Sequence, residues 1–201
     1  MIASRAVALC VVVGASGAAV AAPLNLTLDR PDISSFFISA SYNAATDTLT
    51  ATGTAAAIDF DGIAPPDFNI VGGTFSLSAV IDASGNMSSG TLTIGGSVGA
   101  LGATSPLLIV DLDVFGFGTM PTTQIFEFLG TATGGSLASE FQPLVGTVLN
   151  MGSGFQGSFA TNFSNSGFGT ADTARVVPAP GAAALLAAAG LAGITRRRRV
   201  Q

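Results

Sequence analysis

The chain of 201 residues has no histidine, no tryptophan and no lysine, and its single cysteine is Cys10. Without histidine it cannot form a Ser-His-Asp or Cys-His catalytic site or a histidine-rich zinc site. One cysteine cannot close an intramolecular disulfide, so a folded domain must be held together by apolar burial and backbone pairing. These absences predict a non-catalytic protein with no cofactor and no bound metal.

Positive charge is scarce in the middle of the chain. Residues 22–178 keep only Arg30 and Arg175 of the seven basic residues, but they keep all twelve acidic residues. This region therefore carries ten more negative than positive side chains. Such a charge repels phosphate backbones and anionic lipid, so we expect no nucleic acid among its partners.

The first 21 residues have the three parts of a secretory signal peptide. Arg5 gives a positive N-terminal region, residues 6–13 are apolar, and Ala19 and Ala21 stand at the small-residue positions before a cleavage site. We expect signal peptidase to cut after Ala21. An uncleaved anchor is the weaker alternative, because the apolar run is too short to span a bilayer.

Residues 176–201 end the chain with a second apolar segment. Residues 181–194 carry no charge, and as a helix they would be about 21 Å long, against about 30 Å of bilayer hydrocarbon. Pro180 suits the first helical turn. The four arginines that follow predict a short transmembrane helix whose end stays cytoplasmic, with the preceding domain exported across the inner membrane.

This arrangement of a Pro-x-Pro motif, a short apolar helix and an arginine cluster resembles the PEP-CTERM sorting signal of Gram-negative bacteria. The residues that carry the resemblance are Val177, Pro178, Ala179, Pro180, Arg196, Arg197, Arg198 and Arg199. Where the family has a glutamate between the prolines, this chain has Ala179. The resemblance implies that an exosortase-type enzyme recognises and removes the tail, in a pathway associated with exopolysaccharide. The alternative is a single-span anchor that is never cut.

The region between the two signals, residues 22–175, has the two-residue periodicity of half-buried strands. Gly- and Pro-rich turns separate the strands, which we predict at 35–42, 48–55, 74–81, 90–94, 107–115, 124–131, 147–149 and 154–163. With no amphipathic helix among them, they predict one antiparallel β-sandwich or jelly-roll-like domain. Segments 41–53 and 126–135 also resemble parts of uncharacterised, exported β-rich proteins that bear this tail.

The alternation also predicts which side chains are buried. In 35–42 the apolar set is Phe36, Ile38, Ala40 and Tyr42, and in 48–55 a ladder of threonines alternates with small apolar residues. The expected core includes Phe75, Leu77, Ile81, Leu92, Ile94, Val110 and Leu112.

Three groups of residues could carry chemistry. Asp59 with Asp61, and Asp111 with Asp113, each offer two carboxylates to Ca²⁺, although neither pair completes an EF-hand loop. The others are a possible glycosidase pair, Glu127 and Glu140, and possible sugar-stacking rings, Phe155, Phe159, Phe163 and Phe168. An ordinary structural role, on a solvent-exposed face or in the core, explains the presence of each group at least as well.

Two functions fit these features of the sequence. The first is an exported, exosortase-processed and non-catalytic protein of the cell surface or extracellular matrix, associated with exopolysaccharide and biofilm. Its partners would be signal peptidase, the processing enzyme and, through the C-terminal helix, transiently the inner membrane. The alternative is a carbohydrate-binding or carbohydrate-active module that uses carboxylates and phenylalanines.

Overall fold

The computed structural model describes residues 22–63, 65–120 and 123–177, and the regular structure in these ranges is almost entirely antiparallel strand. The strands are β1 (Leu28–Asn43), β2 (Thr48–Asp59), β3 (Phe68–Asn69), β4 (Val71–Ile81), β5 (Met87–Val98), β6 (Ala103–Thr104), β7 (Leu108–Met120), β8 (Thr123–Gly134), β9 (Val145–Gly152), β10 (Phe163–Ser164) and β11 (Gly169–Val176). Two 3₁₀ segments are also described, η1 (Gly99–Leu101) and η2 (Ala138–Phe141). The predicted all-β architecture is confirmed.

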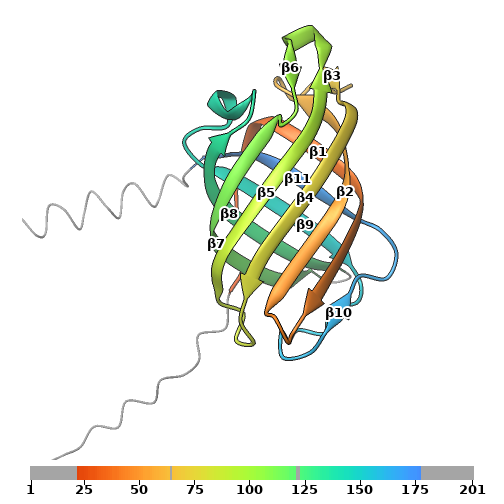
Figure 1. The fold of residues 1–201 in the computed structure, drawn as a ribbon, viewed down its shortest axis with the longest axis vertical. Coiled ribbons are helices and arrows are strands. Elements are labelled where there is room, and N and C mark those ends of the chain that lie inside the picture. The colour runs from red at the N-terminus through yellow and green to blue at the C-terminus, as the bar shows by residue number, and fades with distance from the viewer. Residues whose placement is uncertain (1–21, 64, 121–122, 178–201) are drawn as a thin grey trace, which may run out of the picture.

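The strands form a single sheet that closes into a barrel (Figure 1). Around the ring the order is β1-β11-β9-β8-β7-β5-β4-β2, and β2 pairs back onto β1. The predicted sandwich or jelly roll would need two packed sheets, so this part of the prediction is corrected to a closed barrel of eight strands. Alternating polarity is common to both architectures and does not encode closure.

An irregularity in the middle of β1 bends this strand. The register shifts between Ser35 and Ile38 against β11, and between Phe36 and Ser39 against β2. Phe37 has a φ of 55°, a left-handed conformation that is strained for a bulky residue. Because the bulge also changes the side-chain alternation, Phe36 is 43 % exposed, and its predicted place on the buried face is wrong.

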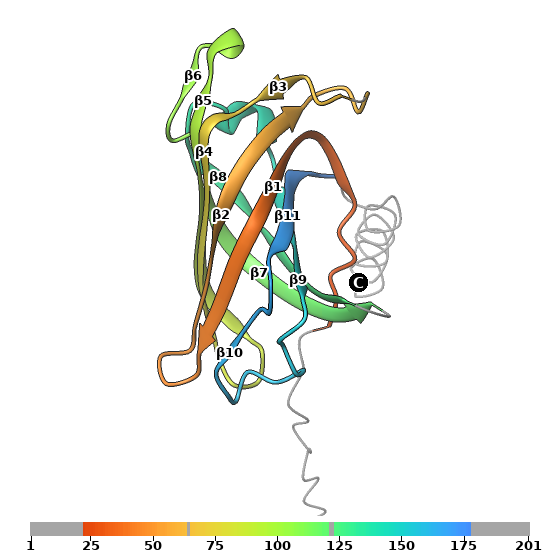
Figure 2. The same cartoon turned by 90° about the vertical axis from the view of Figure 1, so that its right-hand side faces the viewer.

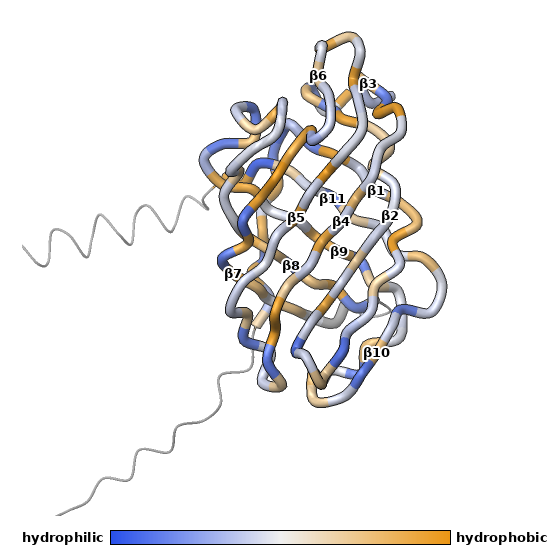
Figure 3. The backbone as a smooth tube through the Cα atoms, viewed as in Figure 1, coloured by the Kyte–Doolittle hydropathy of each residue, from blue (hydrophilic) through white to orange (hydrophobic). Residues whose placement is uncertain are grey.

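Along the regular strands, side chains alternate between an apolar interior and a hydroxyl-rich exterior. On β2, Leu49 and Ala51 are buried whereas Thr50 and Thr52 are exposed. Figure 3 shows the same alternation along β4 and β5. The predicted threonine ladder therefore lies on the outside of the barrel.

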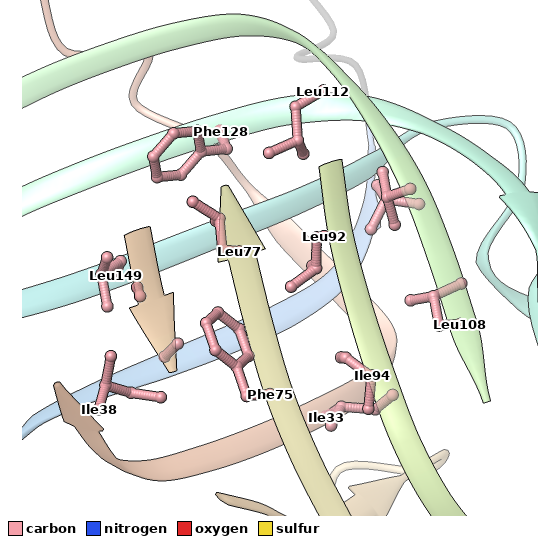
Figure 4. Packing of buried hydrophobic residues seen from close by; sticks show 14 of the residues in the cluster. Ile33, Ile38, Phe75, Leu77, Leu92, Ile94, Leu108, Leu112, Phe128 and Leu149 are labelled. Carbon is pink, nitrogen blue, oxygen red and sulfur yellow. The ribbon is translucent and has the colours of Figure 1, made fainter. Parts of the chain in front are cut away.

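Apolar side chains fill the interior (Figure 4). The seven predicted core residues are each at most 4 % exposed, which confirms that prediction. One part of the core is aromatic, since Phe126 contacts Phe115, Phe155 and Phe159 with ring centroids 5.0–5.8 Å apart.

The chain after β9 differs from the prediction. Instead of a strand over 154–163, it forms a loop whose Phe155 and Phe159 pack inward, and only Phe163 begins the short β10. No strand is predicted over 169–176, yet β11 fills the space between β1 and β9. The inward-facing Thr173 of β11 hydrogen-bonds to Thr147 at 3.1 Å, and these buried hydroxyls interrupt the apolar alternation by which a strand is recognised.

The start of β1 and the end of β11 lie side by side. Leu28 is opposite Val176, and the Val177 N–H donates to the Thr27 carbonyl at 3.3 Å. In the described part of the chain, no helix is long and apolar enough to cross a membrane. The predicted signal peptide, residues 1–21, and the predicted apolar helix, residues 181–194, lie outside the described residues.

The single tyrosine, Tyr42, ties the end of β1 to the end of β4. It is 2 % exposed, and its hydroxyl donates to the Ile81 carbonyl at 2.6 Å and to the Asp47 carboxylate at 3.3 Å. Burial, followed by the negative charge of Asp47, raises the pKa of Tyr42 to about 12. Since the unfolded chain has a tyrosine pKa near 10.0, the stabilisation is complete below that pH and is lost as pH rises toward 12.

We therefore expect the free energy of unfolding to fall between about pH 10 and pH 12. Tyr42→Phe should abolish this fall at high pH. Near neutral pH it should lower the free energy of unfolding by about 1–2 kcal/mol, because the Ile81 carbonyl loses its donor. Urea denaturation at a series of pH values, with phenolate absorbance reporting the one tyrosine, measures both effects. An equal alkaline loss in Tyr42→Phe would contradict this assignment.

Candidate functional site

The first described residues cross the outside of the barrel. This segment, residues 22–27, is called the N-terminal strap, and Figure 2 shows it running from β1 along the outer surface. The Glu127 side chain of β8 holds it: one carboxylate oxygen accepts the Leu24 and Asn25 N–H groups at 2.7 and 3.1 Å, and the other accepts the Leu26 N–H at 3.0 Å. Glu127 is consequently only 7 % exposed.

The barrel surface beneath the strap is built to let it approach. A side chain at Gly116 would collide with Ala22 and Leu24, and one at Gly118 would meet Pro23. The absence of these side chains and the three charge-assisted hydrogen bonds to Glu127 both favour the docked strap. Glu127 is therefore a structural anchor for the chain that follows the predicted cleavage site.

Glu127 and Glu140, the possible glycosidase pair, are not brought together. Glu127 lies seven residues before Gly134, the last residue of β8, and Glu140 is exposed in η2 beyond that end. Seven residues of strand measure about 23 Å, whereas glycosidase carboxylates lie within about 10 Å of each other. Since both Glu127 oxygens also accept strap N–H groups, the pair has no catalytic geometry.

The loop after β2 brings three carboxylates together. Oxygens of Asp59, Asp61 and Asp67 lie within 4.8 Å of one another. Asp59 and Asp61 are the pair that the sequence offered for Ca²⁺. Nothing in the sequence pointed to Asp67, because only the conformation of the loop brings it near them. Each carboxylate accepts a backbone N–H of the loop, and Arg30 lies 3.3 Å from Asp59. These bonds explain the loop without a cation.

Arg30 also pairs with Asp32 of β1, at 2.9 Å. Burial raises the pKa of Asp32, and the neighbouring carboxylate of Asp172 raises it further, whereas Arg30 lowers it. The guanidinium is thus shared between β1 and the loop after β2. It offsets part of the negative charge gathered at this edge of the barrel.

A groove of about 460 Å³ lies on the outer surface of β4, β5 and β7. It forms where two strands diverge: β5 pairs with β7 only through residues 91–94 and 108–111, although β5 begins at Met87 and β7 continues to Met120. Its polar lining residues are Ser78, Ser88, Ser89, Thr91, Asp111 and Asp113. The second predicted carboxylate pair, Asp111 and Asp113, therefore lies in this groove among hydroxyl groups.

The four candidate sugar-stacking rings divide into two groups. Phe155 and Phe159 are buried and Phe163 is partly buried, so their core interpretation is confirmed. Phe168 is 71 % exposed and meets Phe37, itself 65 % exposed, edge to face with centroids 5.7 Å apart. Sequence reasoning missed Phe37, although the adjacent pair Phe36-Phe37 interrupts the alternation of that strand.

Of the predicted sorting residues, only Val177 is described, and it is exposed directly after β11. The other predicted processing residues lie outside the described residues: Ala19, Ala21, Pro178, Ala179, Pro180, Arg196, Arg197, Arg198 and Arg199.

No protein-family model matches the chain, and no curated protein or solved structure is significantly similar to it.

We expect Glu127→Gln to loosen the strap, because an amide offers one acceptor oxygen where the carboxylate offers two, and its NH₂ faces backbone donors. The expected loss of stability is about 2–4 kcal/mol. Hydrogen exchange at the Leu24, Asn25 and Leu26 amides should accelerate. Glu140→Gln is the matched control, since Glu140 is exposed and the chemical change is the same. Equal exchange rates in the two variants would refute the anchoring role.

Proposed function

We propose that this chain is the precursor of an exported, non-catalytic protein of the cell surface or extracellular matrix. Signal peptidase removes residues 1–21, and an exosortase-type enzyme removes the PEP-CTERM-like tail. The mature barrel then associates with exopolysaccharide, as in a biofilm. It binds no nucleic acid and uses no cofactor.

The N-terminal strap is the observation that carries this proposal. The barrel packs the chain from Ala22 onward, which is the residue directly after the predicted cleavage bond. Cleavage after Ala21 would leave every described contact of the strap in place. A leader that is cut here leaves the hydrogen bonds between the strap and Glu127 in place.

The other end of the barrel chain supports removal of the tail. β11 ends at Val176, and the Pro-x-Pro motif begins two residues later at Pro178. Loss of the chain from Pro178 onward removes no described strand. A processing enzyme would thus cut within a few residues of the last strand in the sequence.

The exported protein should begin at Ala22 and should lack the four terminal arginines. N-terminal sequencing and intact-mass measurement of the protein released by the cell test both ends. Pro178→Ala combined with Pro180→Ala should cause the full tail to be retained, and Pro143→Ala is the control for losing a proline elsewhere. Retention of the arginines in most unmutated molecules would make the protein a membrane anchor instead.

A carbohydrate-binding role is the second candidate, and the Phe37–Phe168 pair favours it. Two exposed rings in contact, one of them on a strained bulge, form an apolar feature that the core does not require. Aromatic faces stack on the C–H surfaces of sugars. Loss of glycan binding in Phe37→Ser with Phe168→Ser would support this role, and unchanged binding would exclude that pair.

A further inference from the structure

A row of hydroxyl groups crosses the outer face of the barrel. Strand register places five polar residues opposite one another from strand to strand: Ser41 of β1, Thr50 of β2, Ser78 of β4, Thr91 of β5 and Asp111 of β7. All five are exposed. Neighbouring strands lie about 4.8 Å apart, so the row offers one polar group at each such step. We call it the hydroxyl row.

A second row runs beside the first, two residues along each strand. It consists of Ser39, Thr52, Ser76 and Thr93, and the two rows are about 6.7 Å apart along the strands. These four side chains are uncharged, and Asp111 is the only charged group in either row. The face is therefore a lattice of hydroxyls rather than a charged surface.

The hydroxyl row leads into the groove. Ser78, Thr91 and Asp111 belong to both, and the groove adds Asp113 and the apolar side chain of Val80. Within the described chain, the side chains of Ser78, Thr91, Asp111 and Asp113 make no hydrogen bond to another protein group. Their hydrogen-bonding capacity is available to a ligand, because the fold does not use it.

We propose that the hydroxyl row and the groove bind an uncharged glycan that lies across the strands. Hydroxyls both donate and accept, so they match the mixed donors and acceptors of a sugar, and a carboxylate accepts from sugar hydroxyls. The groove contains no arginine, and its two carboxylates repel sulfated or acidic polymers. This inference rests on the proposed function, and it names the ligand class and the face that the mature protein would use.

The test measures retardation of the exported protein in native gels that contain dextran or hydroxyethyl cellulose, two uncharged glucans. Retardation by at least one of them is expected, and it should be equal at low and high salt, because a neutral ligand has no charge to screen. Ser78→Ala with Thr91→Val should weaken binding about tenfold or more, since two hydrogen-bonding groups are lost. Asp111→Asn should weaken it by a smaller factor.

Thr91→Ser keeps the hydroxyl and should retain binding, which separates loss of chemistry from loss of fold. Thr170→Val changes an exposed threonine of β11, outside both rows, and is the matched control. The proposal is overturned if neither glucan retards the protein, if only dextran sulfate does, or if Phe37→Ser abolishes binding while Ser78→Ala with Thr91→Val does not. None of these outcomes changes the mass of the processed protein. The proposed export is therefore tested separately, by the N-terminal sequence and the intact mass.

Discussion

Pairing of β1 on both of its edges is the constraint on which the rest of the structure depends. This strand must follow β2 on one side and β11 on the other, and the bulge at Phe36 and Phe37 gives it the necessary bend. Closure leaves the eight ring strands paired with neighbours on both sides along at least part of their length. Sheet proteins with open edges often protect them with lysine, and this chain has no lysine.

Closure also gives the barrel two distinct surfaces. On the side of β7, β8 and β9, the exterior is covered by the N-terminal strap, which needs a buried carboxylate and two glycines of β7. On the side of β2, β4 and β5, no described segment covers the exterior, which is regular, with hydroxyls in register from strand to strand. Two acidic groups that could have suggested chemistry are divided between these surfaces: Glu127 anchors the strap, and Asp111 belongs to the hydroxyl row.

The sequence predicted what depends on local polarity. Alternation identified the core from Phe75 to Leu112, because each inward side chain is apolar regardless of how the sheet closes. It did not predict β11, whose inward face carries Thr173, or the outward turn of Phe36 at the bulge. The role of Glu127 was not visible either, because its partners are backbone N–H groups, which every residue except proline possesses. Asp67 joins Asp59 and Asp61 only through the fold of their loop.

If the chain is exported as proposed, the position of β11 has a consequence for the order of events. The barrel closes through the pairing of its first and last ring strands, and the bond between Arg175 and Asp29 joins residues 146 positions apart. A chain that crosses the membrane N-terminus first delivers β11 last, so the ring cannot close until the whole body has emerged. Only Val177 lies between Val176, the last residue of β11, and the Pro-x-Pro motif that precedes the apolar tail. With the tail in the membrane, as proposed, the final strand would be added while the chain is still tethered, and this tether would limit how far the unclosed sheet can diffuse before its last pairing forms.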